Sequence, residues 1–261
     1  IKMFDVIIKG GSLVDGSGTP GYRADIGVTN EFVEAIGDLA HAESRRIINA
    51  SGLTISPGFI DTHAHTDAVC LTDPQRASGI RQGITTEILG QDGLSYAPLS
   101  KNNYHTFREY LSGILGHPPK NLDMSSIASF RSHYHKKVAV NTAYLIAHGA
   151  VRLETVGFHD VPMTGKNLDH ACRLVRNGID QGAIGLSTGM SYYPNAWSNT
   201  AELVELCRAT NDHGGIYVTH LRDVNTDRGF GGGGVRRRCG LHARRGDRTL
   251  RECGSVAGRT Q

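Results

Sequence analysis

The stretch Gly58-Phe59-Ile60-Asp61-Thr62-His63-Ala64-His65-Thr66-Asp67 is the strongest indicator of the fold of this chain. It is an apolar strand that ends in two histidines separated by one residue. Residues two apart in an extended strand project to the same face, so His63 and His65 present two imidazoles to one point. Neutral imidazole is a common protein ligand for divalent metals, and Asp61 and Asp67 could ligate the ion or orient a histidine. The stretch predicts a metal site at a strand end, with two solvated or structural histidines as the alternative.

The composition is that of an ordinary globular protein. Of 261 residues, 39% are hydrophobic and 20% are charged. No apolar run approaches the ~20 residues that cross a bilayer, and no basic and apolar leader opens the chain, so we expect neither a membrane span nor a signal peptide. Five cysteines without a Cys-x-x-Cys pair argue against a disulfide framework. The expected location is therefore a reducing cytoplasm.

Two patterns of predicted elements divide the chain. Short apolar and β-branched segments separated by turn residues occupy residues 1–57, which predicts a small β-sandwich portion. From residue 58, strands alternate with helical stretches, which is typical of an α/β parallel sheet. The expected strands lie near 55–61, 84–89, 142–148, 183–187 and 215–220. The expected helices lie near 73–82, 104–115, 125–136, 168–181 and 199–213.

The helix expected near 199–213 has the clearest signals. Asn199 or Ser198 can cap its first turn, and Glu202 stands at capping-box spacing from Asn199. Cys207 recurs with the leucines of this helix at helical spacing, so we expect it in the core rather than at a metal.

Residues 228–261 differ in composition from the rest of the chain. They hold nine Gly, nine Arg and two acidic residues, whereas residues 1–227 hold 19 basic and 23 acidic residues. They show neither strand alternation nor a helical stripe, so we expect a Gly/Arg-rich tail that is disordered or is translated from a shifted reading frame. A nucleic-acid-binding tail is the alternative.

Three further motifs lie where predicted strands end. They are Leu89-Gly90-Gln91-Asp92-Gly93-Leu94-Ser95-Tyr96-Ala97-Pro98-Leu99, Gly182-Ala183-Ile184-Gly185-Leu186-Ser187-Thr188-Gly189-Met190-Ser191-Tyr192-Tyr193-Pro194 and Gly214-Gly215-Ile216-Tyr217-Val218-Thr219-His220-Leu221-Arg222-Asp223. Because barrel enzymes place active-site residues at the carboxyl ends of their strands, the polar side chains of these motifs are candidates for one site.

Together with Phe4-Asp5-Val6-Ile7-Ile8-Lys9-Gly10-Gly11 and the histidine pair, these motifs resemble the N-acyl-D-amino-acid deacylase (D-aminoacylase) branch of the amidohydrolase superfamily. The resemblance covers roughly residues 4–227. It implies a TIM-like (β/α) barrel, present here in part at residues 58–227, beside the β-sandwich portion at 1–57. It also implies a hydrolase with one or two zinc ions, which cleaves the amide bond of N-acyl-D-amino acids and releases a carboxylate and a D-amino acid.

The resemblance assigns metal ligation to four residues. His63, His65 and His220 match the family's histidine ligands, and Asp92 stands where the family has a zinc-binding cysteine. A carboxylate is a harder ligand than a thiolate, but it binds zinc and can bridge two ions. The alternative for Asp92 is a plain turn residue.

Substrate contacts are expected from the same strand ends. Ser187 and Tyr192 belong to a motif that lines the substrate pocket in related enzymes, and Tyr193 is an alternative to Tyr192. For each tyrosine, a packed loop aromatic is the alternative to a substrate contact. Arg222 is a candidate for the substrate carboxylate, because a guanidinium pairs with a carboxylate in a bidentate fork. A structural ion pair is the alternative for Arg222. His148 ends another apolar strand; we expect a structural role for it, with a place at this rim as the alternative.

The general base of the family has no match here. It is an aspartate at the end of the last barrel strand and is expected beyond this chain, so no catalytic residue is assigned and we expect the chain to be truncated and inactive. A cyclic-amide hydrolase of the dihydroorotase or hydantoinase type is the alternative enzyme, although the lysine that those enzymes carry on the fourth strand is absent from residues 183–187. A non-catalytic fragment is the other alternative. The expected partner is a small N-acyl amino acid, with no membrane and no nucleic acid.

Overall fold

The structure is a computed structural model of the chain, and it describes residues 3–222. The chain forms two compact units, one of residues Ile1–Phe59 and one that begins at Ile60. The predicted class, an α/β protein with part of a parallel barrel, is confirmed. The predictions made for residues 228–261 lie outside the described residues.

The first unit contains two small sheets. Its strands are β1 (Met3–Lys9), β2 (Ser12–Leu13), β3 (Tyr22–Arg23), β4 (Asp25–Thr29), β5 (Phe32–Gly37), β6 (Glu43–Asn49) and β7 (Thr54–Ile55). The four-stranded sheet has the order β5-β4-β1-β6, and the three-stranded sheet has the order β3-β2-β7. Gly27 of β4 leaves room for the ring of Phe4, since a Cβ at Gly27 would lie 2.6 Å from that ring. A small cluster around Leu13, Ala24 and Ile26 forms the core of this unit.

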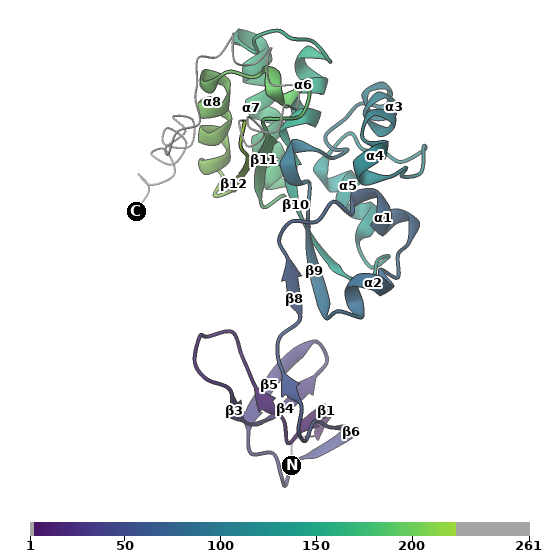
Figure 1. The fold of residues 1–261 in the computed structure, drawn as a ribbon, viewed down its shortest axis with the longest axis vertical. Coiled ribbons are helices and arrows are strands. Elements are labelled where there is room, and N and C mark those ends of the chain that lie inside the picture. The colour runs from purple at the N-terminus through teal and green to yellow at the C-terminus, as the bar shows by residue number, and fades with distance from the viewer. Residues whose placement is uncertain (1–2, 223–261) are drawn as a thin grey trace, which may run out of the picture. The chain divides into compact units, whose positions relative to one another are not determined.

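The second unit is built on a five-stranded sheet in the order β12-β11-β10-β9-β8 (Figure 1). These strands are β8 (Phe59–Asp61), β9 (Ile84–Leu89), β10 (Asn141–Ala147), β11 (Gly185–Gly189) and β12 (Ile216–His220). The pairs β9–β10, β10–β11 and β11–β12 are all parallel. The carboxyl ends of these four strands therefore lie at one edge of the sheet, which is the edge where barrel enzymes place their sites.

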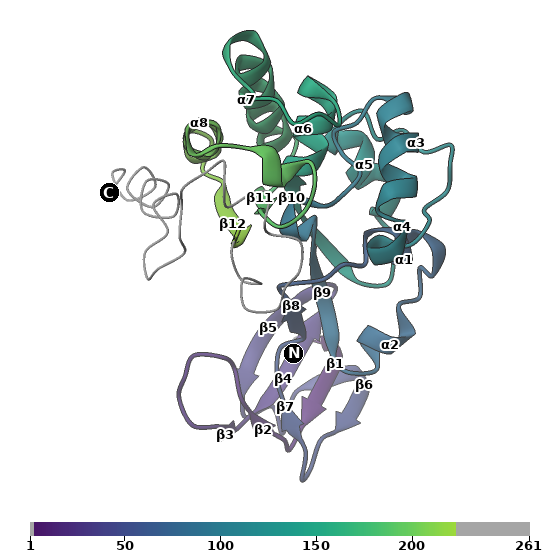
Figure 2. The same cartoon turned by 45° about the horizontal axis from the view of Figure 1, so that its top comes forward.

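Helices connect these strands (Figure 1 and Figure 2). They are α1 (Asp67–Thr72), α2 (Ala77–Ile80), α3 (Lys101–Tyr110), α4 (Ser112–Leu115), α5 (Ile127–Tyr134), α6 (His148–Val156), α7 (Gly165–Asp180) and α8 (Thr200–Asn211). The helix expected near 73–82 is wrong in extent, because Asp73-Pro74 separates α1 from α2. Helix α6 was not expected, because it begins at the residue after β10 with no turn residue between them.

The predicted cap of α8 is confirmed. Asn199 Oδ1 accepts a hydrogen bond from the backbone N–H of Glu202 at 2.9 Å. Cys207 is buried in the core as expected. Within residues 3–222, the cysteines Cys70, Cys172 and Cys207 are buried. A cytoplasmic location stays a prediction. None of the described helices combines the length and the apolar character that a membrane crossing requires.

Candidate metal centre

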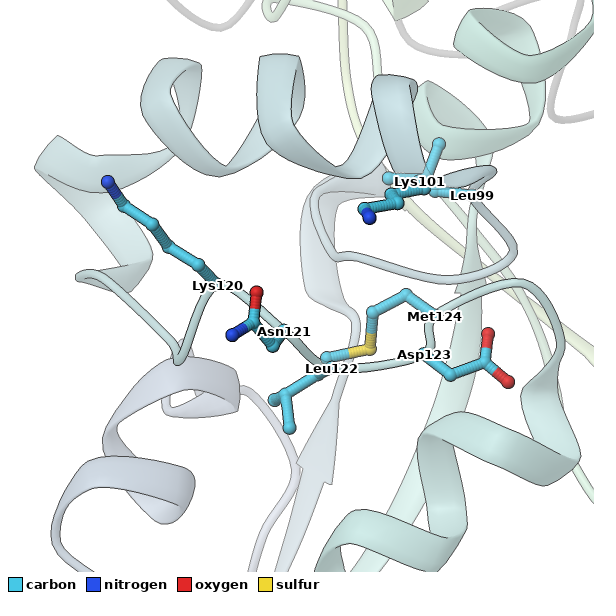
Figure 3. A pocket seen from close by; sticks show the side chains of 7 residues that line it. All are labelled: Leu99, Lys101, Lys120, Asn121, Leu122, Asp123 and Met124. Carbon is cyan, nitrogen blue, oxygen red and sulfur yellow. The ribbon is translucent and has the colours of Figure 1, made fainter.

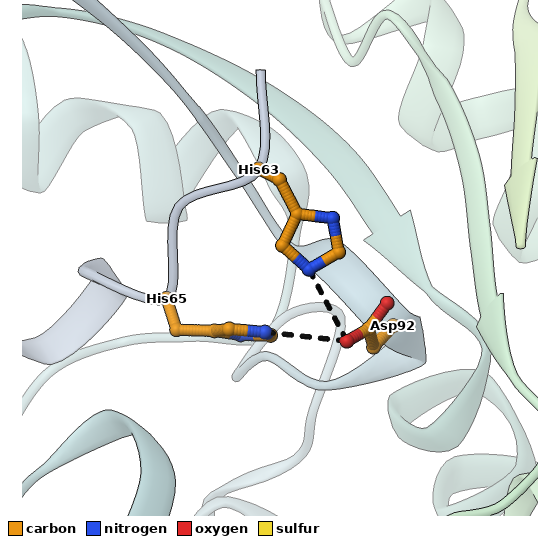
Figure 4. A group of neighbouring side chains, drawn as sticks. All are labelled: His63, His65 and Asp92. Carbon is orange, nitrogen blue, oxygen red and sulfur yellow. Dashed lines mark ion pairs between the residues drawn. The ribbon is translucent and has the colours of Figure 1, made fainter. Parts of the chain in front are cut away.

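The site is formed by side chains at the carboxyl ends of three strands. His63 and His65 follow β8, Asp92 lies in the 3-10 helix η1 (Gln91–Gly93) after β9, and His220 is the last residue of β12. The Nε2 atoms of His63 and His65 each lie 3.3 Å from Asp92 Oδ2 (Figure 4). His220 Nδ1 lies 3.8 Å from the same oxygen. One carboxylate oxygen therefore faces three imidazoles.

The donor atoms suit a zinc ion. His63, His65 and Asp92 offer ligand atoms that all lie within 4.8 Å of one another. Two imidazole nitrogens and a carboxylate oxygen are a common zinc ligand set. The buried ring nitrogens His65 Nδ1 and His220 Nε2 have no hydrogen-bond partner in the structure, which is a costly state for a buried polar atom. These two nitrogens are not the ring atoms that face Asp92, so an ion beside Asp92 would not pair them. The residues fit the metal through the donor atoms of His63, His65 and Asp92.

The charges around Asp92 favour its ionised form. Burial raises the pKa of this carboxyl, but the hydrogen bond with His65 and the charges of His63 and His220 outweigh it, so the pKa of Asp92 lies below its usual value. The hydrogen bond with Asp92 also raises the pKa of His65. The side chain of Asp92 is only 6% exposed, whereas that of His63 is 55% exposed. The site thus presents a nearly buried anionic ligand beside an exposed histidine.

Ser187 does not lie where a substrate contact was expected. Its side chain is fully buried on β11. Its Oγ donates to the carbonyl oxygen of Gly90 and accepts from the N–H of Gly93 at 3.0 Å. The single hydroxyl donor of Ser187 is used by the loop that carries Asp92, which argues against the prediction that Ser187 binds substrate.

The two tyrosines of the same motif differ in their surroundings. The ring centroid of Tyr192 lies 5.2 Å from that of His220. Burial, together with the charge of Asp92, raises the pKa of Tyr192, so its hydroxyl remains a donor at neutral pH. Tyr193 instead packs against Trp197, with 4.8 Å between ring centroids. Tyr192 is thus the tyrosine that the structure brings to the metal group.

Arg222 is held by the chain that leads into α8. Its Nη1 donates to Ala196 O at 2.6 Å, and its Nη2 donates to Ser198 O at 2.9 Å. Ala196 belongs to the 3-10 helix η2 (Asn195–Trp197). A guanidinium has five N–H donors, so these two bonds leave others for a ligand. Its pairing with a substrate carboxylate stays a prediction.

His148 is part of a buried charge network rather than of the rim. The ring is fully buried, and its Nε2 lies 2.7 Å from Glu202 Oε1. Arg152 Nη1 donates to the other oxygen of Glu202 and Nη2 to Val161 O. This contact agrees with the structural role expected for His148: α6 begins at this residue, and its ring contacts the first turn of α8.

Supporting residues around the histidine pair become visible only in the structure. Gln91 Nε2 donates to Thr62 O at 2.7 Å, which joins the Asp92 loop to the histidine stretch. Thr66 Oγ1 donates to Glu87 Oε2 at 2.5 Å. Glu87 is fully buried in β9 and forms an ion pair with Arg76 at 2.6 Å. The sequence signal that could have identified Glu87 is that it is the single acidic residue of the strand 84–89.

A cavity of about 330 Å³ lies away from these groups (Figure 3). It is lined by Leu99, Lys101, Lys120, Asn121, Leu122, Asp123 and Met124. None of these is among the residues predicted for the site.

Comparison with known proteins identifies relatives of this fold. Residues 46–190 match the amidohydrolase family. A D-aminoacylase of Alcaligenes xylosoxydans xylosoxydans is 35% identical over 235 residues, which cover 84% of this chain and 45% of that protein.

Two solved structures are similar over most of the described chain. The N-acyl-D-glutamate deacylase from Bordetella bronchiseptica, complexed with zinc and a phosphonate inhibitor, has 29% identity and a TM-score of 0.78, and the match covers 85% of this chain and 46% of that one. A D-aminoacylase with a binuclear metal center has 30% identity and a TM-score of 0.78 over 97% of this chain and 50% of that one. The chain thus spans about half the length of the proteins that it matches.

Proposed function

The chain belongs to the amidohydrolase family, and on that premise we propose that it is a zinc-dependent hydrolase of the amide bond of N-acyl-D-amino acids, releasing a carboxylate and a D-amino acid. The observation that carries the proposal is the approach of three imidazoles to Asp92 Oδ2 at one edge of a parallel sheet. The relatives named above are D-aminoacylases and an N-acyl-D-glutamate deacylase, which supports this substrate class.

The proposed roles separate metal ligands from substrate contacts. His63, His65, Asp92 and His220 would hold one or two zinc ions. Bound zinc supplies polarisation of the amide carbonyl and a lowered pKa for a water nucleophile. Tyr192, beside His220, would donate a hydrogen bond to the substrate. Arg222 would pair with the substrate carboxylate.

No residue of the described chain is assigned as the general base. Asp92 faces three imidazoles, and the carboxylate of Asp67 is fully buried. We therefore expect the 261-residue chain to show no deacylation by itself. Zinc-dependent release of a D-amino acid by the purified chain would contradict this expectation.

The absence of a lysine on β11 favours linear amides over cyclic amides as substrates. Strand β11 has the sequence Gly-Leu-Ser-Thr-Gly and presents no lysine for a carboxylated metal bridge. Zinc-loaded chain is expected to bind an N-acetyl-D-amino acid more tightly than its L enantiomer or a hydantoin, as measured by calorimetry. Preference for the hydantoin would favour the cyclic-amide alternative.

The metal assignment is tested by zinc affinity in chelator competition. Mutation of a residue that hydrogen-bonds a metal ligand typically lowers metal affinity roughly 10–100-fold, and loss of a ligand itself should lower it at least as much. His63→Ala is therefore expected to bind zinc roughly 10–100-fold more weakly than the wild type. The matched control is His159→Ala, since His159 is an exposed histidine in the loop after α6. Equal affinities in the wild type and His63→Ala would refute the assignment.

A further inference from the structure

The backbone of Asp92 has an unfavourable conformation for a residue with a side chain. Its φ is 57° and its ψ is 24°, which is the left-handed region. Gly90 and Gly93 on either side also have positive φ, at 76° and 67°. No side chain caps η1. The turn that presents Asp92 therefore needs contacts from elsewhere in the fold to hold its shape.

One hydroxyl connects the two ends of this turn. Ser187 Oγ donates to Gly90 O and accepts from Gly93 N, and these groups lie two residues before and one residue after Asp92. The hydroxyl is fully buried, so water does not replace either bond without opening the structure. Ser187 thus fixes the segment from which the Asp92 carboxylate projects.

Strand β11 also fixes the position of His220. In the parallel ladder, Ser187 lies opposite Val218 and Gly189 lies opposite His220. A Cβ at Gly189 would overlap the carbonyl oxygen of Asp92, so the Asp92 loop lies directly against the strand. Ser187 and Gly189 project to the same face, since they are two residues apart. The same strand therefore locates both Asp92 and His220.

We propose that Ser187 is a positioning residue that sets the Asp92 carboxylate against the histidines, and that the zinc affinity of the site depends on its hydroxyl. Ser187 acts through the backbone of Gly90 and Gly93 and does not itself contact the ion or the substrate. The inference rests on the proposed function, because it assigns Ser187 to the support of the zinc site.

The test compares two variants that each remove one buried hydroxyl from β11. Ser187→Ala removes the bonds to the Asp92 loop. Thr188→Val is the matched control, because Thr188 is equally buried and its Oγ1 bonds Tyr217 Oη at 2.8 Å and Thr219 Oγ1 at 2.7 Å instead. Circular dichroism confirms that each full-length chain is folded. If Ser187→Ala does not fold, Ser187→Cys replaces it, since a thiol keeps a weaker donor in the same place.

Two quantities are measured: hydrogen exchange of the Gly93 amide in the metal-free chain, and zinc affinity in chelator competition. Ser187→Ala is expected to speed the exchange at least about tenfold and to weaken zinc binding at least about tenfold, as for the loss of other partners that orient metal ligands. For Ser187→Cys we expect smaller changes in the same direction. Thr188→Val is expected to change the exchange of the Gly93 amide by less than about threefold, because its partners lie outside the Asp92 loop.

The outcomes separate this inference from the proposed function. If the wild type binds zinc and Ser187→Ala binds it as tightly, the inference fails and the proposed function stands. Equally faster exchange of the Gly93 amide in Ser187→Ala and Thr188→Val would assign the effect to general packing of β11 and would also overturn the inference. A wild-type chain that binds no zinc would overturn both.

Discussion

Asp67 follows the histidine pair and has a fully buried carboxyl group. Ser95 Oγ donates to its Oδ1, and Oδ2 has no hydrogen-bond partner in the structure. Burial raises the pKa of Asp67 to about 6, and the hydrogen bond from Ser95 only partly opposes this. Because the folded pKa exceeds the unfolded value of 3.8, the neutral carboxyl contributes stability that is complete below pH 3.8 and is lost as the pH rises through about 6.

Replacement of Asp67 by Asn should remove this pH dependence. Between pH 4.5 and 7.5, the wild type is expected to lose about 2 kcal/mol of unfolding free energy relative to Asp67→Asn, because the buried carboxyl must ionise in the wild type only. Urea unfolding of the metal-free chain measures the difference. Asp123→Asn is the control, since hydrogen bonds from Ser125 and Ser129 lower the pKa of Asp123 and its contribution changes only at more acidic pH. Parallel pH profiles of the wild type and Asp67→Asn would contradict the prediction.

Residue types and spacing predicted much of the candidate site. The structure brings His63, His65 and Asp92 into one group, with His220 at 3.8 Å from Asp92. The contacts of Ser187 and His148 could not be predicted, because both depend on partners far away in the sequence. Ser187 is 94 residues from Gly93, and His148 is 54 residues from Glu202.

Among the elements, α8 combines a local signal with a distant contact. Its first turn is capped by Asn199, as the sequence predicts. The Glu202 side chain does not return to the cap; it contacts His148 and Arg152 of α6 instead. The capping-box spacing therefore identified the start of the helix but not the partner of its acidic residue.

The contribution of the Asn199 cap to the stability of α8 can be tested by mutation. Asn199→Ala is expected to lower the unfolding free energy by about 1 kcal/mol, because the N–H of Glu202 loses its acceptor. The control is Thr164→Ala, since Thr164 occupies the N-cap position of α7 without a capping side-chain bond. That variant should change stability by less than about 0.5 kcal/mol. Similar losses in the two variants, measured by urea unfolding, would argue against the capping assignment.

For the whole molecule, the two units have separate apolar cores. The larger core runs through the second unit and includes Leu89, Phe107, Tyr144 and Leu186. The smaller core of the first unit is centred on Leu13 and Ile26. All four proposed metal ligands belong to the second unit. A ligand stabilises the cooperative unit that binds it, so zinc should act on the second unit alone.

Hydrogen exchange with mass spectrometry can show whether zinc stabilises the second unit alone. Saturating zinc is expected to slow exchange in peptides from β9 to β12 and to leave β1, β4, β5 and β6 unchanged. At a zinc concentration about 100-fold above Kd, the stabilisation should be about 2.7 kcal/mol. The control is the His63→Ala variant under the same conditions, in which the slowing should be reduced. Equal slowing in the two units would show that they unfold together.

The sequence by itself determined what depends on residues close together in the chain. Strand and helix periodicity predicted the α/β class, and the two histidines of one strand end predicted a shared direction for their side chains. Turn residues and Asn199 predicted where elements begin and end. The physical reason is that local backbone geometry and local hydrogen bonds act over a few residues.

Only the tertiary structure decided which strand ends meet and which polar groups are buried. Parallel pairing placed β11 between β10 and β12. In this order Ser187 contacts the Asp92 loop, and His220 lies opposite Gly189 of the same strand. The same packing enclosed His148 with Glu202 and raised the pKa of Asp67. These properties depend on desolvation and on contacts between segments tens of residues apart, and no local pattern encodes either one.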